Sequence, residues 1–129
     1  MTDDGETFAI RLPPQRTLRL AVRRMTPARS TVTITGDLVK VDAGTWTARL
    51  PLADIASATI VDEPGRPTPG VHDHHGGHWT VTGLPGPVVR LTMRPGALSN
   101  LFPAMRSLDV GLLEPNAFLA AWHRRTIQT

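Results

Sequence analysis

Apolar and polar residues alternate with a period of two through most of this chain, and this alternation constrains the fold more than any other feature. In residues 30–44, Val32 and Ile34 alternate with threonines, and a second alternating run follows Gly36-Asp37. A period of two places successive side chains on opposite faces of a β-strand. Gly-Asp is also an accepted two-residue hairpin turn. The segment therefore predicts a β-hairpin with one buried face.

The same alternation recurs along the chain at intervals typical of hairpins. The segments are 7–12, 17–24, 45–52, 57–62, 78–83, 87–93 and 108–113. Together with the hairpin they predict about seven to nine short strands in a single domain that spans residues 1–129. Closing such strands into a barrel removes exposed sheet edges, so we expect a small antiparallel β-barrel.

One segment near the C-terminus follows a helical period instead. Pro115 suits the first position of a helix, and Phe118, Ala121 and Trp122 recur on one helical face. We predict an α-helix at 115–126 that caps the barrel with its aromatic residues. Residues 52–55 are predicted to form a short helical turn.

Two connections are unusual in composition. Residues 63–77 consist mainly of turn-forming residues and predict a long mobile loop. Residues 95–106 are more apolar, and four of them fall at helix-like spacing: Leu98, Leu101, Phe102 and Met105. They predict either a helical turn over one mouth of the barrel or an exposed apolar patch for a partner or a membrane surface.

Charge gives two interpretations of the N-terminal region. Net charge is only +3, and every basic residue except Lys40 is arginine. Arg19, Arg23 and Arg24 lie in an arginine-rich stretch that is either a solvated strand face or a surface for an anionic partner. No aromatic residues are interleaved with these arginines, so the stacking platforms of single-stranded nucleic-acid binders are missing and we expect no specific nucleic-acid binding.

Several chemistries are excluded or unsupported. The chain has no cysteine, which rules out disulfides and thiolate sites. It has neither a Gly-x-Ser-x-Gly elbow nor a phosphate-binding glycine loop. No apolar run approaches the roughly 20 residues that span a bilayer, and residues 1–6 are too acidic for a signal peptide. We therefore expect a cytoplasmic protein without catalytic residues.

Histidine is concentrated in one short stretch. Four of the five histidines lie within seven positions: His72, His74, His75 and His78. Imidazole ligands suit zinc or nickel, which predicts a metal-binding or metal-sensing site. Ordering a glycine-rich loop costs backbone entropy, however, of about 1–2 kcal/mol per residue. A bare loop, weak metal binding and an evolved site therefore remain open alternatives.

The C-terminal half resembles a known family. The tail carries Leu108, Val110, Leu112, Glu114, Pro115, Phe118 and Trp122, and the strand before it carries Gly86, Val89, Arg90 and Leu91. Over residues 45–125 these motifs look like those of small actinobacterial pleckstrin-homology-like (PH-like) proteins of unknown function. The resemblance implies a PH-like barrel with one C-terminal capping helix and a role in binding lipids, peptides or proteins.

These observations favour a non-enzymatic binding or interaction module with an unknown protein or lipid partner. The first alternative is a zinc- or nickel-binding protein that uses the histidines at 72–78. The second is peripheral membrane association through the basic N-terminal strands or the apolar segment at 98–105. An exposed edge strand leaves self-association open as well.

Overall fold

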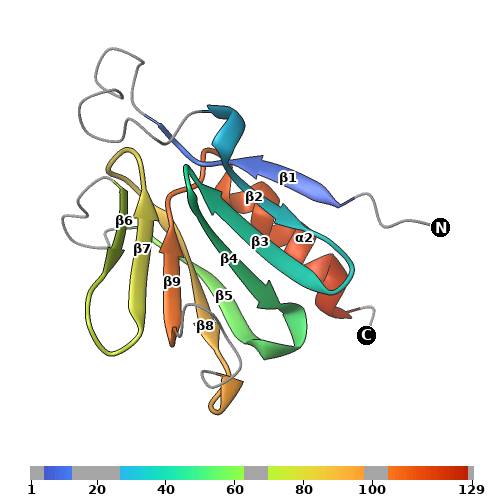
Figure 1. Ribbon diagram of the computed structural model, residues 1–129. Coiled ribbons are helices and arrows are strands. Elements are labelled where there is room, and N and C mark those ends of the chain that lie inside the picture. Colours follow the sequence, from blue (N-terminus) through green and yellow to red (C-terminus); the bar gives the residue numbers. More distant parts are fainter. Residues whose placement is uncertain (1–4, 13–26, 63–69, 98–104, 128–129) are drawn as a thin grey trace.

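The computed structural model describes residues 5–12, 27–62, 70–97 and 105–127 (Figure 1). The strands are β1 (Glu6–Ala9), β2 (Ser30–Ile34), β3 (Leu38–Ala43), β4 (Trp46–Pro51), β5 (Ile55–Val61), β6 (Gly70–Asp73), β7 (His78–Thr82), β8 (Val88–Met93) and β9 (Ser107–Val110). Two short 3-10 helices, η1 (Pro27–Arg29) and η2 (Leu52–Asp54), and one α-helix, α2 (Pro115–Ile127), complete the described elements.

The strands form two sheets. One has four strands in the order β1-β2-β3-β4, and the other has five in the order β5-β8-β9-β7-β6. The mainly-β prediction with one C-terminal helix is confirmed. The predicted closure is wrong for the described residues, because strand pairing joins the two sheets there only at one isolated antiparallel bridge, between Ile10 and Leu112, and does not close them into a barrel. The predicted strand at 17–24 lies outside the described residues.

The four-stranded sheet follows the predicted alternation. Val32 and Ile34 on β2 are buried opposite Val41 and Val39 on β3. The backbone N–H of Thr35 donates to the carbonyl of Leu38 at 2.9 Å, which closes the predicted two-residue turn. This hairpin is confirmed in register and in buried face.

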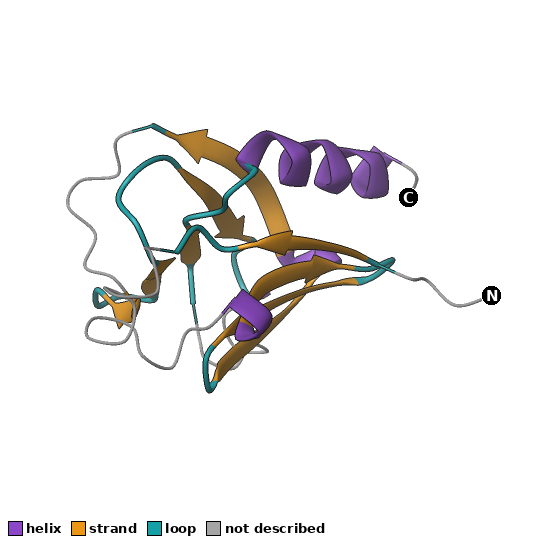
Figure 2. Cartoon of the chain, turned by 90° about the horizontal axis from the view of Figure 1, so that it is seen from above, coloured by secondary structure: helices purple, strands orange, loops and turns teal. Residues whose placement is uncertain are grey.

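The C-terminal helix covers one side of the opening between the sheets (Figure 2). It contacts β5 and β8 of the second sheet, and the ring of Phe118 packs edge-on against Phe8 of β1 at 5.4 Å between centroids. Phe118, Ala121 and Trp122 are buried as the helical spacing predicted. Elsewhere the indoles of Trp46 on β4 and Trp79 on β7 stack at 5.7 Å, which links the same two sheets.

The order of the five-stranded sheet differs from a chain of hairpins. β9 lies between β7 and β8, parallel to β7 and antiparallel to β8. β7 and β8 are close in sequence but are therefore not neighbours in the sheet. The predicted loop at 63–77 also needs correction, because Gly70–Asp73 forms β6 and pairs with β7. Residues 63–69 lie outside the described part.

Arg11 binds the chain where it leaves β9. Its backbone N–H donates to the carbonyl of Gly111 at 2.8 Å, and its guanidinium donates to the carbonyls of Leu112 at 3.0 Å and Pro87 at 2.9 Å. A longer bond of 3.5 Å reaches Leu84. Burial lowers the pKa of Arg11 from its ordinary value, yet a guanidinium keeps its charge at any physiological pH. The β7–β8 loop and the end of β9 are thus held by one cation.

Two glycines make room for Arg11. A Cβ at Gly83 would overlap the carbonyl oxygen of Arg11, whereas a Cβ at Gly111 would lie 3.5 Å from its Nη2, an ordinary contact. Gly86 has φ +140°, and a Cβ there would come within 2.8 Å of the same nitrogen. The close approach of the Arg11 backbone requires glycine at 83, the positive φ favours glycine at 86, and neither reason applies at 111.

Gly83→Ala and Gly111→Ala form a matched pair of variants. We expect Gly83→Ala to lower the free energy of unfolding by about 2 kcal/mol, since overpacking forces the backbone apart. Gly111→Ala should stay within about 1 kcal/mol of the wild type, because alanine fits there and restricts the unfolded chain. Urea unfolding measures both values. Equal values for the two variants would contradict the close approach at Gly83.

Candidate functional site

Two rows of polar side chains cross the five-stranded sheet on the face opposite the core. On β8 the residues that alternate with them, Val89 and Leu91, are buried in the core, as are Leu108 and Val110 on β9. The first row, from β5 to β6, is Thr59, Arg90, Asp109, Thr80 and His72. The second row is Ser57, Thr92, Ser107 and His78. Strand pairing therefore gathers these residues from distant parts of the chain.

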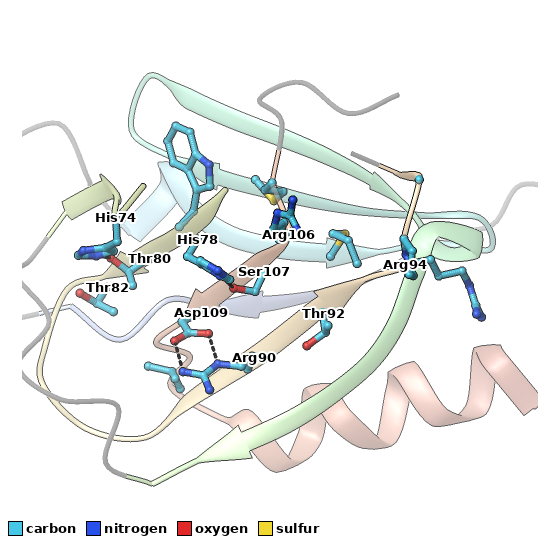
Figure 3. Close-up of a pocket in the computed structure, with 16 residues that line it drawn as sticks. His74, His78, Thr80, Thr82, Arg90, Thr92, Arg94, Arg106, Ser107 and Asp109 are labelled. Atoms are coloured by element: carbon cyan, nitrogen blue, oxygen red, sulfur yellow. Dashed lines mark hydrogen bonds and ion pairs between the residues drawn. The ribbon is translucent and has the colours of Figure 1, made fainter. Parts of the chain in front are cut away.

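A cavity of about 1040 Å³ lies along this face. The members of both rows on β7, β8 and β9 line it, and Figure 3 shows their side chains on neighbouring strands around it. Arg94 and Arg106 line it near the end of β8 and the start of β9, and Met93 lies in its wall. Its size is that of a small-molecule site.

Arg90 and Asp109 form the central contact of the first row. Nε of Arg90 donates to Oδ1 of Asp109 at 2.8 Å, and Nη2 donates to Oδ2 at 2.9 Å. Asp109 is only 7% exposed. The hydrogen bond to this carboxylate raises the pKa of Arg90, and burial opposes it. The two parallel hydrogen bonds make the pair a bidentate fork, in which the guanidinium offsets the charge of the buried carboxylate.

A double-mutant cycle on Arg90→Ala and Asp109→Ala measures this fork. We expect a coupling energy of about 1 kcal/mol or more, because either single variant leaves the other, partly buried charge without its partner. The exposed pair Lys40–Asp42, 3.7 Å apart, is the control and should couple by less than about 0.5 kcal/mol. Similar coupling in both cycles, by urea unfolding, would show that the buried fork has no special strength.

Two of the predicted histidines line the cavity. Nε2 of His74 hydrogen-bonds the hydroxyl of Thr80 at 2.9 Å, and Nδ1 of His78 hydrogen-bonds the hydroxyl of Ser107 at 2.8 Å. Each imidazole is therefore oriented by a neighbouring hydroxyl and keeps its second ring nitrogen for another partner. These two contacts place His74 and His78 on the polar face rather than in a free loop.

The other two histidines lie toward the sheet edge. His72 is on β6, and its ring centroid is 6.2 Å from that of His74. His75 lies in the β6–β7 turn with φ 73°, and its backbone N–H donates to Asp73 at 2.9 Å. Over the described ranges, no three His, Asp or Glu side chains are grouped so as to hold a metal ion. The zinc or nickel site stays a prediction of the sequence.

Metal binding has a direct test in thermal unfolding with added Zn²⁺ or Ni²⁺. We expect no rise in melting temperature, because the histidines do not converge on one point and two of them bond hydroxyls. A ligand that binds only the native state would raise it by mass action. A rise of several degrees that is lost in the His74→Ala/His75→Ala variant would establish the predicted metal site instead.

The remaining predicted sites have different outcomes. Arg19, Arg23 and Arg24 lie outside the described residues, as do Leu98, Leu101 and Phe102. Met105 is fully buried in the core, so its assignment to an exposed apolar patch is corrected. It belongs instead to the hydrophobic cluster between the sheets.

Sequence reasoning missed the residues that line the cavity beside the histidines. Arg90, Asp109 and Ser107 belong to alternating segments, and their polar positions there indicate a solvent-facing side of a strand. Nothing in those segments shows that β8 and β9 are neighbours or that β7 lies on the other side. The strand order alone brings the three side chains together.

Comparison with protein families, with characterised proteins and with solved structures gives no match to this chain. Among the described helices none has the length and apolar character needed to cross a membrane.

Proposed function

We propose that the chain is a non-enzymatic binding module that holds a small organic anion in the cavity on the five-stranded sheet. The observation that carries this proposal is the charge of the lining. Arg90, Arg94 and Arg106 line the cavity against one carboxylate, Asp109. That carboxylate is already neutralised by Arg90. The field inside the cavity therefore favours a negatively charged ligand.

Arg106 is the cation that we assign to the ligand. Nε of Arg94 donates to the carbonyl of Ala53 at 2.7 Å, and Arg90 is bound by Asp109. For Arg106, by contrast, no residue in the described ranges forms a hydrogen bond or ion pair with the guanidinium. Its backbone is held by Gly77 and Met93, so the side chain starts from a fixed point in the cavity. A guanidinium offers paired donors that match a carboxylate or phosphate.

The proposal of a non-enzymatic role rests on the contacts of the polar rows. Ser107 and His78 have the contact of a nucleophile with its base. A working triad also needs a third group that orients the imidazole. In Asp109, the carboxylate in the cavity, both oxygens accept hydrogen bonds from Arg90 rather than from a histidine. These contacts fit ligand binding better than acyl transfer.

The PH-like resemblance remains part of this proposal. A last strand followed by a helix that packs over the opening between two sheets supports it. The parallel pairing of β7 with β9 departs from a wholly antiparallel barrel. The cavity described above, rather than the resemblance, therefore supports the choice of ligand.

Thermal unfolding in sulfate or citrate, against chloride at equal ionic strength, tests the proposed function. We expect both anions to raise the melting temperature by several degrees, since a bound ligand stabilises the native state by about 2.7 kcal/mol at one hundred times its Kd. Arg106→Ala should lose this rise. Arg49→Ala, which removes an exposed arginine of β4 outside the cavity, should keep it.

Two results would contradict the proposed function. One is that neither sulfate nor citrate stabilises the wild type more than chloride does. The other is that Arg106→Ala and Arg49→Ala respond to the anions equally, which would mean that the stabilisation comes from the general exclusion of these anions from the protein surface.

A further inference from the structure

We propose that His78 contacts the bound anion together with Arg106 and couples anion binding to the uptake of a proton. This inference rests on the proposed function, since it names the second ligand-contacting residue of the same cavity. Histidine is the side chain that ordinarily gains its charge between about pH 8 and pH 5. An anion bound beside it therefore favours the protonated imidazole.

The backbone brings His78 and Arg106 together. The N–H groups of Arg106 and Ser107 both donate to the carbonyl of Gly77, at 2.6 and 3.3 Å, and Gly77 directly precedes His78. A Cβ at Gly77 would lie 3.2 Å from Cγ of Arg106, so the stem of the arginine passes over this glycine. The two side chains thus start from adjacent points at the beginning of β7 and β9.

The hydrogen bond to Ser107 orients His78 toward the cavity. It occupies Nδ1 and leaves Nε2 as the ring nitrogen that can donate to a ligand. The hydroxyl of Ser107 can accept a hydrogen bond as readily as it donates one, so the contact survives protonation of the ring. Figure 3 shows His78, Ser107 and Arg106 on the same side of the cavity.

The charged and titratable groups near His78 come from β6, β8, β9 and the segments next to these three strands. From β6 and the β6–β7 turn come His72, His74 and Asp73, and from β8, β9 and the segments at their ends come Arg90, Arg94, Asp109 and Arg106. Asp73 caps the turn through the N–H of His75, and Asp109 pairs with Arg90. Neither carboxylate is hydrogen-bonded to His78 in the described structure. A bound anion would thus supply the opposite charge for both the imidazolium and Arg106.

Isothermal titration with sulfate at about pH 8 and about pH 5.5 tests the inference. Sulfate keeps its two charges throughout this range, so any change in affinity belongs to the protein. We expect about tenfold tighter binding at the lower pH, the effect of one added charge near the ligand. In buffers of different ionisation enthalpy, the same titration near neutral pH should report uptake of a proton.

The variant His78→Gln keeps a hydrogen-bonding side chain but cannot be protonated. We expect it to bind sulfate with the same affinity at both pH values. His123→Gln is the matched control, because His123 lies exposed on α2 outside the cavity, and it should keep the full pH dependence. In the wild type, saturating sulfate should also raise the midpoint of the NMR titration of the His78 ring, a readout that needs no variant.

The outcomes separate this inference from the proposed function. Sulfate binding that needs Arg106 but has the same affinity at both pH values would overturn the role of His78 and leave the anion site intact. A pH dependence that persists in His78→Gln would assign the proton to another group and also overturn it. Absence of sulfate binding at either pH would overturn both.

Discussion

The guanidinium of Arg11 donates to three backbone carbonyls, those of Leu84, Pro87 and Leu112, and so joins the β7–β8 loop to the chain that follows β9. β9 lies between β7 and β8, so the loop that joins those two strands must pass over its end. Arg11 donates both to this loop, at Pro87, and to the residue after Gly111, Leu112. Gly83 lets the backbone of Arg11 approach closely enough. Charged donors to carbonyls are among the stronger hydrogen bonds in proteins, which suits a junction of three segments.

The insertion of β9 also creates the cavity. It places Asp109 between Arg90 and Thr80, and Ser107 between Thr92 and His78. Asp109 pairs with Arg90, and Arg106 at the start of β9 is the cation that we assign to the proposed ligand. At this end the carbonyl of Gly77 receives two N–H groups of β9 and sets His78 beside that cation. The proposed anion site is thus a direct consequence of strand order.

Much of the local structure could be predicted, because alternation and helical spacing are properties of short segments. The hairpin at 30–44 and the helix that begins at Pro115 follow from them. The strand order could not be predicted, since pairing joins segments far apart and alternation does not say which strands are neighbours. For the same reason the predicted strand at 78–83 did not reveal the partner of His78, which bonds Ser107, 29 residues away. The ion pair of Arg90 and Asp109 could not be predicted either, because these residues meet only through the pairing of β8 with β9.

Backbone nuclear Overhauser contacts are the first measurement to make, because they report whether β9 lies between β7 and β8. We expect contacts in a parallel pattern between Val81 and Val110 and their neighbours, and in an antiparallel pattern between Leu91 and Leu108. We expect no cross-strand contacts between β7 and β8. Direct contacts between β7 and β8, as in a simple hairpin, would contradict the strand order. They would also contradict the polar rows and the cavity, which depend on that order.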